Sequence, residues 1–169
     1  MTHTTSRGRG RRTVRTAVAV GAATLGLVAL SACGEKPTPM STVTVGSDSV
    51  STQAACYRDG KTISQDQAFS CAKRKAGKAI TVGEGEMLRI GVDPEIAKSG
   101  WVLFLNGEPA MVTPIEKTYR SFSSDEIFTS RDAQGNTSKT KSAQLSIVEY
   151  DGSQYRGVWN VKLERETSG

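Results

Sequence analysis

Histidine is nearly absent from this 169-residue chain, which contains His3 and no other. Imidazole is the usual general base near neutral pH and the commonest metal ligand. Catalysis by a serine–histidine or cysteine–histidine pair and blue-copper chemistry are therefore excluded from the rest of the chain. Cysteine is also scarce, with three residues and no Cys-x-x-Cys spacing. No Gly-x-Ser-x-Gly motif, phosphate-binding loop or dinucleotide fingerprint occurs either.

Positive charge is concentrated at one end of the chain. The sequence has 22 Lys and Arg residues against 17 Asp and Glu residues, a formal net charge of +5. Five of the arginines lie within residues 7–15, and no acidic residue precedes Glu35. From Cys33 onward the chain is formally neutral, with 17 residues of each sign. Nucleic acid is therefore not an expected partner.

The first 32 residues have the layout of an export signal. An arginine-rich start is followed by an apolar stretch over 17–30 and by small residues before Cys33. A helix of about 14 residues spans roughly 21 Å, which is shorter than the roughly 30 Å hydrocarbon core of a bilayer. A permanent membrane span is therefore the weaker interpretation. General secretion is favoured over the twin-arginine route, because Thr13-Val14-Arg15 fits poorly after an arginine pair.

The end of this segment, Leu30-Ser31-Ala32-Cys33, resembles the lipobox of bacterial lipoproteins. The resemblance implies cleavage between Ala32 and Cys33 and attachment of diacylglycerol, palmitate being a typical acyl group, to the Cys33 thiol. Two acyl chains would hold the protein stably on the cell membrane, because each buried methylene contributes about 0.8 kcal/mol. An ordinary cleaved signal and an uncleaved anchor are the alternatives.

Three parts are predicted, with the signal peptide at 1–32, a lipid-anchored linker at 33–41 and one β domain at 42–166. Cys56 and Cys71 remain as an even pair in an exported, oxidising environment, so we expect a disulfide between them. Closing a loop of about 15 residues would stabilise the domain by about 3 kcal/mol. A redox pair and a pair of metal ligands are the competing interpretations, and we expect no metal and no cofactor.

Short alternating apolar patterns predict six to eight strands in the domain. The expected strands include 42–45 with its continuation 49–52 beyond Gly46, the hairpin of 79–82 with 88–92, and the apolar run 101–105 as a central strand buried on both faces. Asn106-Gly107 predicts a turn into a short edge strand at Pro109. The expected fold class is mainly β, an antiparallel β-sandwich of immunoglobulin-like or cupredoxin-like type with one short helix near its start.

The last two strands, on either side of Asp151-Gly152, predict a hairpin with a definite register. Pairing Leu145 with Trp159 and Ile147 with Gly157 would keep the apolar residues of both strands on one face. Such pairing needs a loop with an odd number of residues, such as 151–153 with a bulge.

The single expected helix begins at a capping box, Ser64 to Gln67, and ends at Gly77. The run Lys73-Arg74-Lys75 near its end has two interpretations. It could bind phosphate or acidic lipid headgroups, or it could supply cations to the negative end of the helix dipole, which we favour.

Carboxylates are the remaining catalytic candidates. Asp93 and Glu95, or Asp125 and Glu126, could form a hydrolytic pair. A simpler interpretation of 124–128 is a helical turn with acids at its start. A Cu(I) site would require the side chains of Met87 and Met111 to lie close together. No catalytic or metal-binding residue is predicted.

Several further segments resemble one family over the whole chain. They are the arginine-rich signal, the lipobox, Lys36-Pro37-Thr38-Pro39, the segments 41–46 and 90–96, and Gly157-Val158-Trp159. Together they resemble small actinobacterial lipoproteins of an uncharacterised domain family, best known from streptomycetes. The resemblance implies a tethered extracytoplasmic domain and no known activity.

We therefore expect a monomeric, non-catalytic domain on the extracytoplasmic face of the cell membrane, held by lipid on Cys33. Its expected role is binding or association with the envelope, and its partner is not identified by the sequence. The alternative is a carboxylate-dependent hydrolase acting on cell-wall glycans, which should gather two or more of the four carboxylates in one cleft. A binding module should instead present an apolar or aromatic patch.

Overall fold

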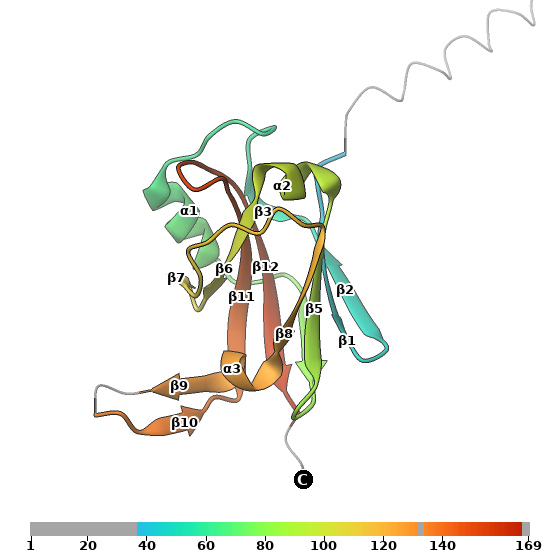
Figure 1. Cartoon of the computed structure of the whole chain (residues 1–169), viewed down its shortest axis with the longest axis vertical. Coiled ribbons are helices and arrows are strands. Elements are labelled where there is room, and N and C mark those ends of the chain that lie inside the picture. The colour runs from blue at the N-terminus through green and yellow to red at the C-terminus, as the bar shows by residue number, and fades with distance from the viewer. Residues whose placement is uncertain (1–36, 132–133, 167–169) are drawn as a thin grey trace, which may run out of the picture. The chain divides into compact units, whose positions relative to one another are not determined.

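The computed structural model describes residues 37–131 and 134–166, which form two packed β-sheets and three short helices (Figure 1). The four-stranded sheet has the order β2-β1-β5-β8, with β1 (Ser41–Val45), β2 (Asp48–Thr52), β5 (Met87–Val92) and β8 (Tyr119–Ser123). The six-stranded sheet has the order β3-β12-β11-β6-β7, and its sixth strand, β4 (Ala79–Val82), also pairs with β12. The other strands of this sheet are β3 (Ala54–Tyr57), β12 (Tyr155–Arg165), β11 (Ser142–Tyr150), β6 (Trp101–Leu105) and β7 (Glu108–Pro109). A small separate sheet pairs β9 (Thr129–Arg131) with β10 (Thr137–Lys139).

The helices are α1 (Gln65–Ala72), α2 (Pro94–Ser99) and α3 (Ser124–Phe128). The predicted mainly β, sandwich-like fold is confirmed, and the strand pairs of the described residues are antiparallel except for β4 with β12. The expectation of a single helix is wrong. The expected helical turn at 124–128 is present as α3, whereas α2, which follows β5, was not predicted.

The core has two layers, one on each face of the six-stranded sheet. Trp101 and Leu103 of β6 face the core between the two sheets, whereas Val102 and Phe104 face a second cluster that α1 covers. The prediction that 101–105 is buried on both faces is therefore confirmed. The turn after β6 is confirmed as well, since Asn106 and Gly107 both have positive φ, 51° and 82°.

The register of the β11–β12 hairpin differs from the predicted one. Ile147 pairs with Trp159 and Leu145 with Val161. The apolar residues of the two strands share the inter-sheet face as expected, but the predicted partners, Trp159 for Leu145 and Gly157 for Ile147, are wrong.

Two features of the connection explain the difference. The loop has four residues, 151–154, rather than the predicted odd number, and the expected bulge is present, since Arg156 has no partner between the pairs Tyr150–Tyr155 and Glu149–Gly157. The carboxylate of Asp151 organises the loop. This carboxylate accepts hydrogen bonds from the hydroxyl (2.8 Å) and backbone N–H (2.9 Å) of Ser153 and from the backbone N–H of Gln154 (2.8 Å). It also pairs with Arg156 at 2.8 Å. These donors, the Ser153 hydroxyl first, hold the pKa of Asp151 well below its usual range.

Two other strand predictions are wrong for a common reason. The segment 49–52 does not extend the first strand but returns beside it, so that β1 and β2 form a hairpin around Gly46, whose φ is 55°. The segments 79–82 and 87–92 do not pair with each other, since β4 lies in the six-stranded sheet and β5 in the four-stranded sheet. Local alternation indicates a strand but not its partner.

Helix α1 begins as predicted and ends earlier than predicted. Ser64 Oγ accepts a hydrogen bond from the backbone N–H of Gln67 at 3.2 Å, which confirms the amino-terminal cap. The helix ends at Ala72 rather than at Gly77. Amide side chains from the sheet replace a glycine cap, because Gln144 on β11 and Asn160 on β12 donate hydrogen bonds to carbonyls at its carboxyl end.

Candidate functional site

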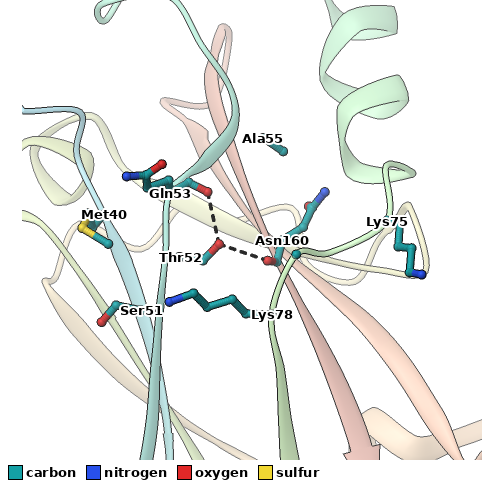
Figure 2. A pocket seen from close by; sticks show the side chains of 9 residues that line it. Met40, Ser51, Thr52, Gln53, Ala55, Lys75, Lys78 and Asn160 are labelled. Atoms are coloured by element: carbon teal, nitrogen blue, oxygen red, sulfur yellow. Dashed lines mark hydrogen bonds between the residues drawn. The ribbon is translucent and has the colours of Figure 1, made fainter.

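A cleft opens where the edge of β12 is left uncovered. Strand β3 pairs with residues 157–159 of β12, and β4 pairs with residues 162–165. Between these two partners lie Asn160 and Val161, and the carbonyl of Asn160 accepts a hydrogen bond from Thr52 Oγ1 at 3.3 Å. The resulting cleft has a volume of about 510 Å³. Its lining residues, most of them labelled in Figure 2, are Met40, Ser51, Thr52, Gln53, Ala55, Lys75, Gly77, Lys78 and Asn160.

Asn160 is the most unusual of the lining residues. It is 4 % exposed, and its Nδ2 donates hydrogen bonds to the carbonyls of Cys71 and Arg74, each at 2.9 Å. Its Oδ1 is buried and accepts no hydrogen bond within the described part of the chain. In Figure 2 the side chain of Asn160 rises from β12 between Ala55 and Lys75. A buried carbonyl oxygen without a donor is costly, so the site is suited to a ligand that donates a hydrogen bond.

Two lysines border the cleft and have no acidic partner. Lys75 and Lys78 are exposed, and neither forms an ion pair with any described residue. Figure 2 shows Lys78 extending across the cleft toward Ser51, with Lys75 on the opposite side. No lining residue is acidic, so the cleft has an uncompensated positive charge.

The rest of the basic run is already engaged by the fold. Lys73 pairs with Glu108 at 3.2 Å, and Arg74 Nη1 donates a hydrogen bond to the carbonyl of Ala55 at 3.2 Å. Helix α1 ends at Ala72, so the basic run follows at its carboxyl end, in agreement with the favoured interpretation, but outside its last turn. Lys73 is the cap residue, and Lys75 lies at the cleft.

The start of the described chain lies beside the cleft. Met40 lines the cleft, and its N–H donates a hydrogen bond to Asp93 Oδ2 at 2.8 Å. The buried carbonyl of Pro39 accepts a hydrogen bond from Trp159 Nε1 at 2.8 Å. These contacts attach residues 39–41, predicted as linker, to the folded domain. Cys33, the predicted lipidation site, and the predicted cut between Ala32 and Cys33 lie outside the described residues.

The four carboxylates of the enzyme hypothesis lie at two separate places. Asp93 and Glu95 follow the Val92 end of β5, where α2 begins. The Asp93 carboxylate already accepts a hydrogen bond from the backbone N–H of Met40. Asp125 and Glu126 are in α3, which follows the end of β8 that pairs with Met87. Figure 1 places α2 and α3 at opposite ends of the sandwich. The fold therefore separates the two pairs by the length of β5.

Sequence reasoning missed one carboxylate, Glu149 on β11. Its side chain is 2 % exposed, and its Oε2 has no hydrogen-bond partner among the described residues. Burial raises the pKa of Glu149, and the charges of Glu95 and Asp151 add to the rise, while a hydrogen bond from Ser99 and the charge of Arg156 oppose it.

The methionines named as possible copper ligands point to different surroundings. Met87 is 43 % exposed on the outward face of β5, whereas Met111 is partly buried against the core. Met111 lines a second hollow, an apolar groove of about 330 Å³ beside β6 and β8. The fold does not bring the two sulfur atoms to one site.

Cys56 on β3 and Cys71 on α1 form a disulfide, with 6.1 Å between their Cα atoms. The bond joins the strand that borders the cleft on one side to the helix end that Asn160 caps. It therefore fixes the wall of the cleft as well as the fold.

Comparisons with known proteins identified no relative of the chain. Scans against protein-family models, curated proteins and solved structures each found no match to the chain. Among the described residues, no helix is both long and apolar enough to cross a membrane.

Proposed function

We propose that the protein is a lipid-anchored domain on the extracytoplasmic face of the cell membrane, and that it binds a ligand in the cleft without transforming it. The observation that carries the binding role is the buried, unpartnered Oδ1 of Asn160 beside two unpaired lysines. The two ammonium groups can hold an anion, and the amide oxygen can accept a hydrogen bond from a donor on the same ligand. The lining contains no carboxylate that could act as a general base for a bound substrate.

The position of the chain start supports the anchored arrangement. If Cys33 bears the lipid, Pro39, whose carbonyl is fixed to Trp159, lies six positions further along the chain. Six extended residues reach roughly 20 to 22 Å. The end of the domain that carries Met40 and the cleft would then stay close to the lipid headgroups.

The alternative, a carboxylate-dependent hydrolase of cell-wall glycans, has one observation in its favour. A buried carboxyl with a raised pKa, Glu149, lies near enough to the exposed Glu95 for their charges to interact. Such pairs divide acid and base roles in glycosidases. However, a catalytic acid must reach its substrate, and Glu149 does not line the cleft, whereas Asn160 does. The binding role is therefore the better supported of the two.

Mass spectrometry of the amino-terminal peptide tests the anchor. We expect a mature chain that begins at Cys33 and carries a diacylglycerol, and we expect the Cys33→Ser variant to lack this mass and to leave the membrane fraction. An unmodified Cys33 peptide, or a peptide that begins elsewhere, would contradict the anchor.

Photo-crosslinking in intact cells tests the cleft. A benzoylphenylalanine at Gly77 is suitable, because a Cβ there would meet no atom within 4 Å. The matched control carries the same group at Val112, which is 78 % exposed and does not line the cleft. We expect an adduct from position 77 that Lys78→Gln weakens and that position 112 does not form. Equal adducts from both positions would argue against a cleft ligand.

A further inference from the structure

We propose that the cleft binds a phosphate group on a small hydroxylated carrier, of the glycerol phosphate type. This inference rests on the binding role proposed above and names the class of ligand. Two features of the lining carry it. One is the pair of unpaired ammonium groups, and the other is the buried amide oxygen of Asn160.

The ammonium groups select the anionic part of the ligand. Lys75 and Lys78 have no ion-pair partner within the described ranges, and no lining side chain is acidic. No lining residue is arginine, whose planar fork matches the two oxygens of a carboxylate. A lysine acts as a point charge and serves commonly as a phosphate ligand. A phosphate held by one of these ammonium groups also gains from the positive charge of the other, on the opposite side of the cleft.

The amide oxygen selects the neutral part of the ligand. Both hydrogens of Asn160 Nδ2 are used on the carbonyls of Cys71 and Arg74, so the amide can offer a ligand only its acceptor, Oδ1. A phosphodiester has no donor to offer. A ligand ammonium group would be repelled by Lys75 and Lys78. A hydroxyl satisfies both conditions, because it is neutral and its hydrogen can rotate toward the oxygen.

The size of the cleft is consistent with a ligand of this class. Its volume of about 510 Å³ falls within the roughly 300 to 1,000 Å³ typical of small-molecule sites. Glycerol phosphate occurs both as a lipid headgroup and in free or polymeric form, and both sources offer the same phosphate and hydroxyl chemistry. The test below separates them.

The test uses the full-length protein in neutral detergent micelles and follows the ³¹P line width of added phosphates. Glycerol 1-phosphate should broaden on binding, and propyl phosphate, which lacks the hydroxyls, should bind at least fivefold more weakly. Lys78→Gln should raise the Kd for glycerol 1-phosphate about tenfold through the loss of one charge-assisted contact. Lys61→Gln, an exposed lysine away from the cleft, should change it less than twofold.

Three results would overturn the inference. They are no broadening by any phosphate, equal affinity for propyl phosphate, and an unchanged Kd in Lys78→Gln. Competition by glycerate separates the two proposals. If this carboxylate displaces glycerol 1-phosphate at equal concentration, the phosphate class is wrong and the binding cleft remains. If no anion binds and position 77 also gives no adduct in cells, both proposals fail.

Nanodiscs distinguish the two sources of the ligand. With phosphatidylglycerol around the anchored protein, a headgroup in the cleft should raise the apparent Kd for free glycerol 1-phosphate relative to phosphatidylcholine discs. Equal Kd values in the two discs assign the cleft to a free or polymeric phosphate. Either result supports the inference, whereas the absence of binding in both discs overturns it.

Discussion

Two regions of the six-stranded sheet each hold a buried polar atom that lacks a partner among the described residues, and their surroundings differ in charge. Asn160 Oδ1 lies on the α1 side of the sheet, next to a cleft bordered by Lys75 and Lys78. Glu149 Oε2 lies on the inter-sheet side, where the charges of Glu95 and Asp151 act on it. We call these the cleft and the Glu149 region.

The comparison shows that the way in which an unpartnered buried atom can be satisfied depends on the groups around it. The Glu149 carboxylate can reduce the free-energy cost of its burial by binding a proton, because burial favours the neutral carboxyl. The amide of Asn160 has no such route, since it does not titrate. Only a donor from outside the described fold can satisfy it, and the neighbouring lysines make an anionic carrier of that donor favourable.

Removal of the disulfide should have the largest effect and should act on the cleft. Replacing both Cys56 and Cys71 with Ala releases a loop of 15 residues, and we expect a loss of about 3 kcal/mol in the free energy of unfolding. Chemical denaturation measures the loss, and reduction of the parent protein should reproduce it. Because the Cys71 carbonyl holds Asn160, ligand binding should also weaken. An unchanged stability would show that the bond does not constrain this region.

A matched pair of glycine substitutions should separate the two regions next. At Gly157, which pairs with Glu149, a Cβ would lie 2.5 Å from Trp159 Cη2 and 3.0 Å from Tyr57 Cδ2. Gly157→Ala should therefore cost about 1 to 3 kcal/mol through overpacking. Gly77→Ala, in the cleft, meets no atom within 4 Å and should stay within about 0.5 kcal/mol of the parent. Equal effects of the two substitutions would contradict this account of the packing.

Glu149→Gln should have the smallest effect, with a sign that depends on pH. The pKa of Glu149 is raised above its usual 4.5, so the stability that its protonated form contributes is complete below pH 4.5 and is lost as pH rises through the raised value. The neutral amide avoids that loss. The variant should be more stable than the parent at pH 7.5, and the difference should shrink at pH 4.

Denaturation midpoints at the two pH values check this prediction, with Glu126→Gln, an exposed residue of α3, as the control. A variant that is less stable than the parent at pH 7.5 would mean that the ionised Glu149 has a partner that the present account lacks.

Much of the fold followed from local patterns in the sequence. The apolar run 101–105, the cap at Ser64 and the turn at Asn106-Gly107 were predicted because each depends on residues that are close in sequence. Strand pairing depends on distant residues. The separation of β4 and β5 into two sheets and the shifted β11–β12 register therefore escaped prediction.

The candidate site was harder to predict than the fold. The basic run drew attention to Lys75, but Asn160 is a single amide between Trp159 and Val161, and its isolation comes from the gap between β3 and β4. A signal was present for both buried polar residues. Glu149 is in phase with the apolar Leu145 and Ile147, and Asn160 is in phase with Val158. A polar residue in phase with a buried face is therefore worth testing as a site.

The central claim is that the amide of Asn160 meets the ligand of the cleft, and selective ¹⁵N-asparagine labelling tests it directly. The sequence has three asparagines, so the spectrum should contain three side-chain amide pairs, and those of Asn106 and Asn136 serve as internal controls. On addition of glycerol 1-phosphate, we predict that the Asn160 pair shifts and that the other two stay in place. Movement of all three pairs together, or of none, would contradict the claim.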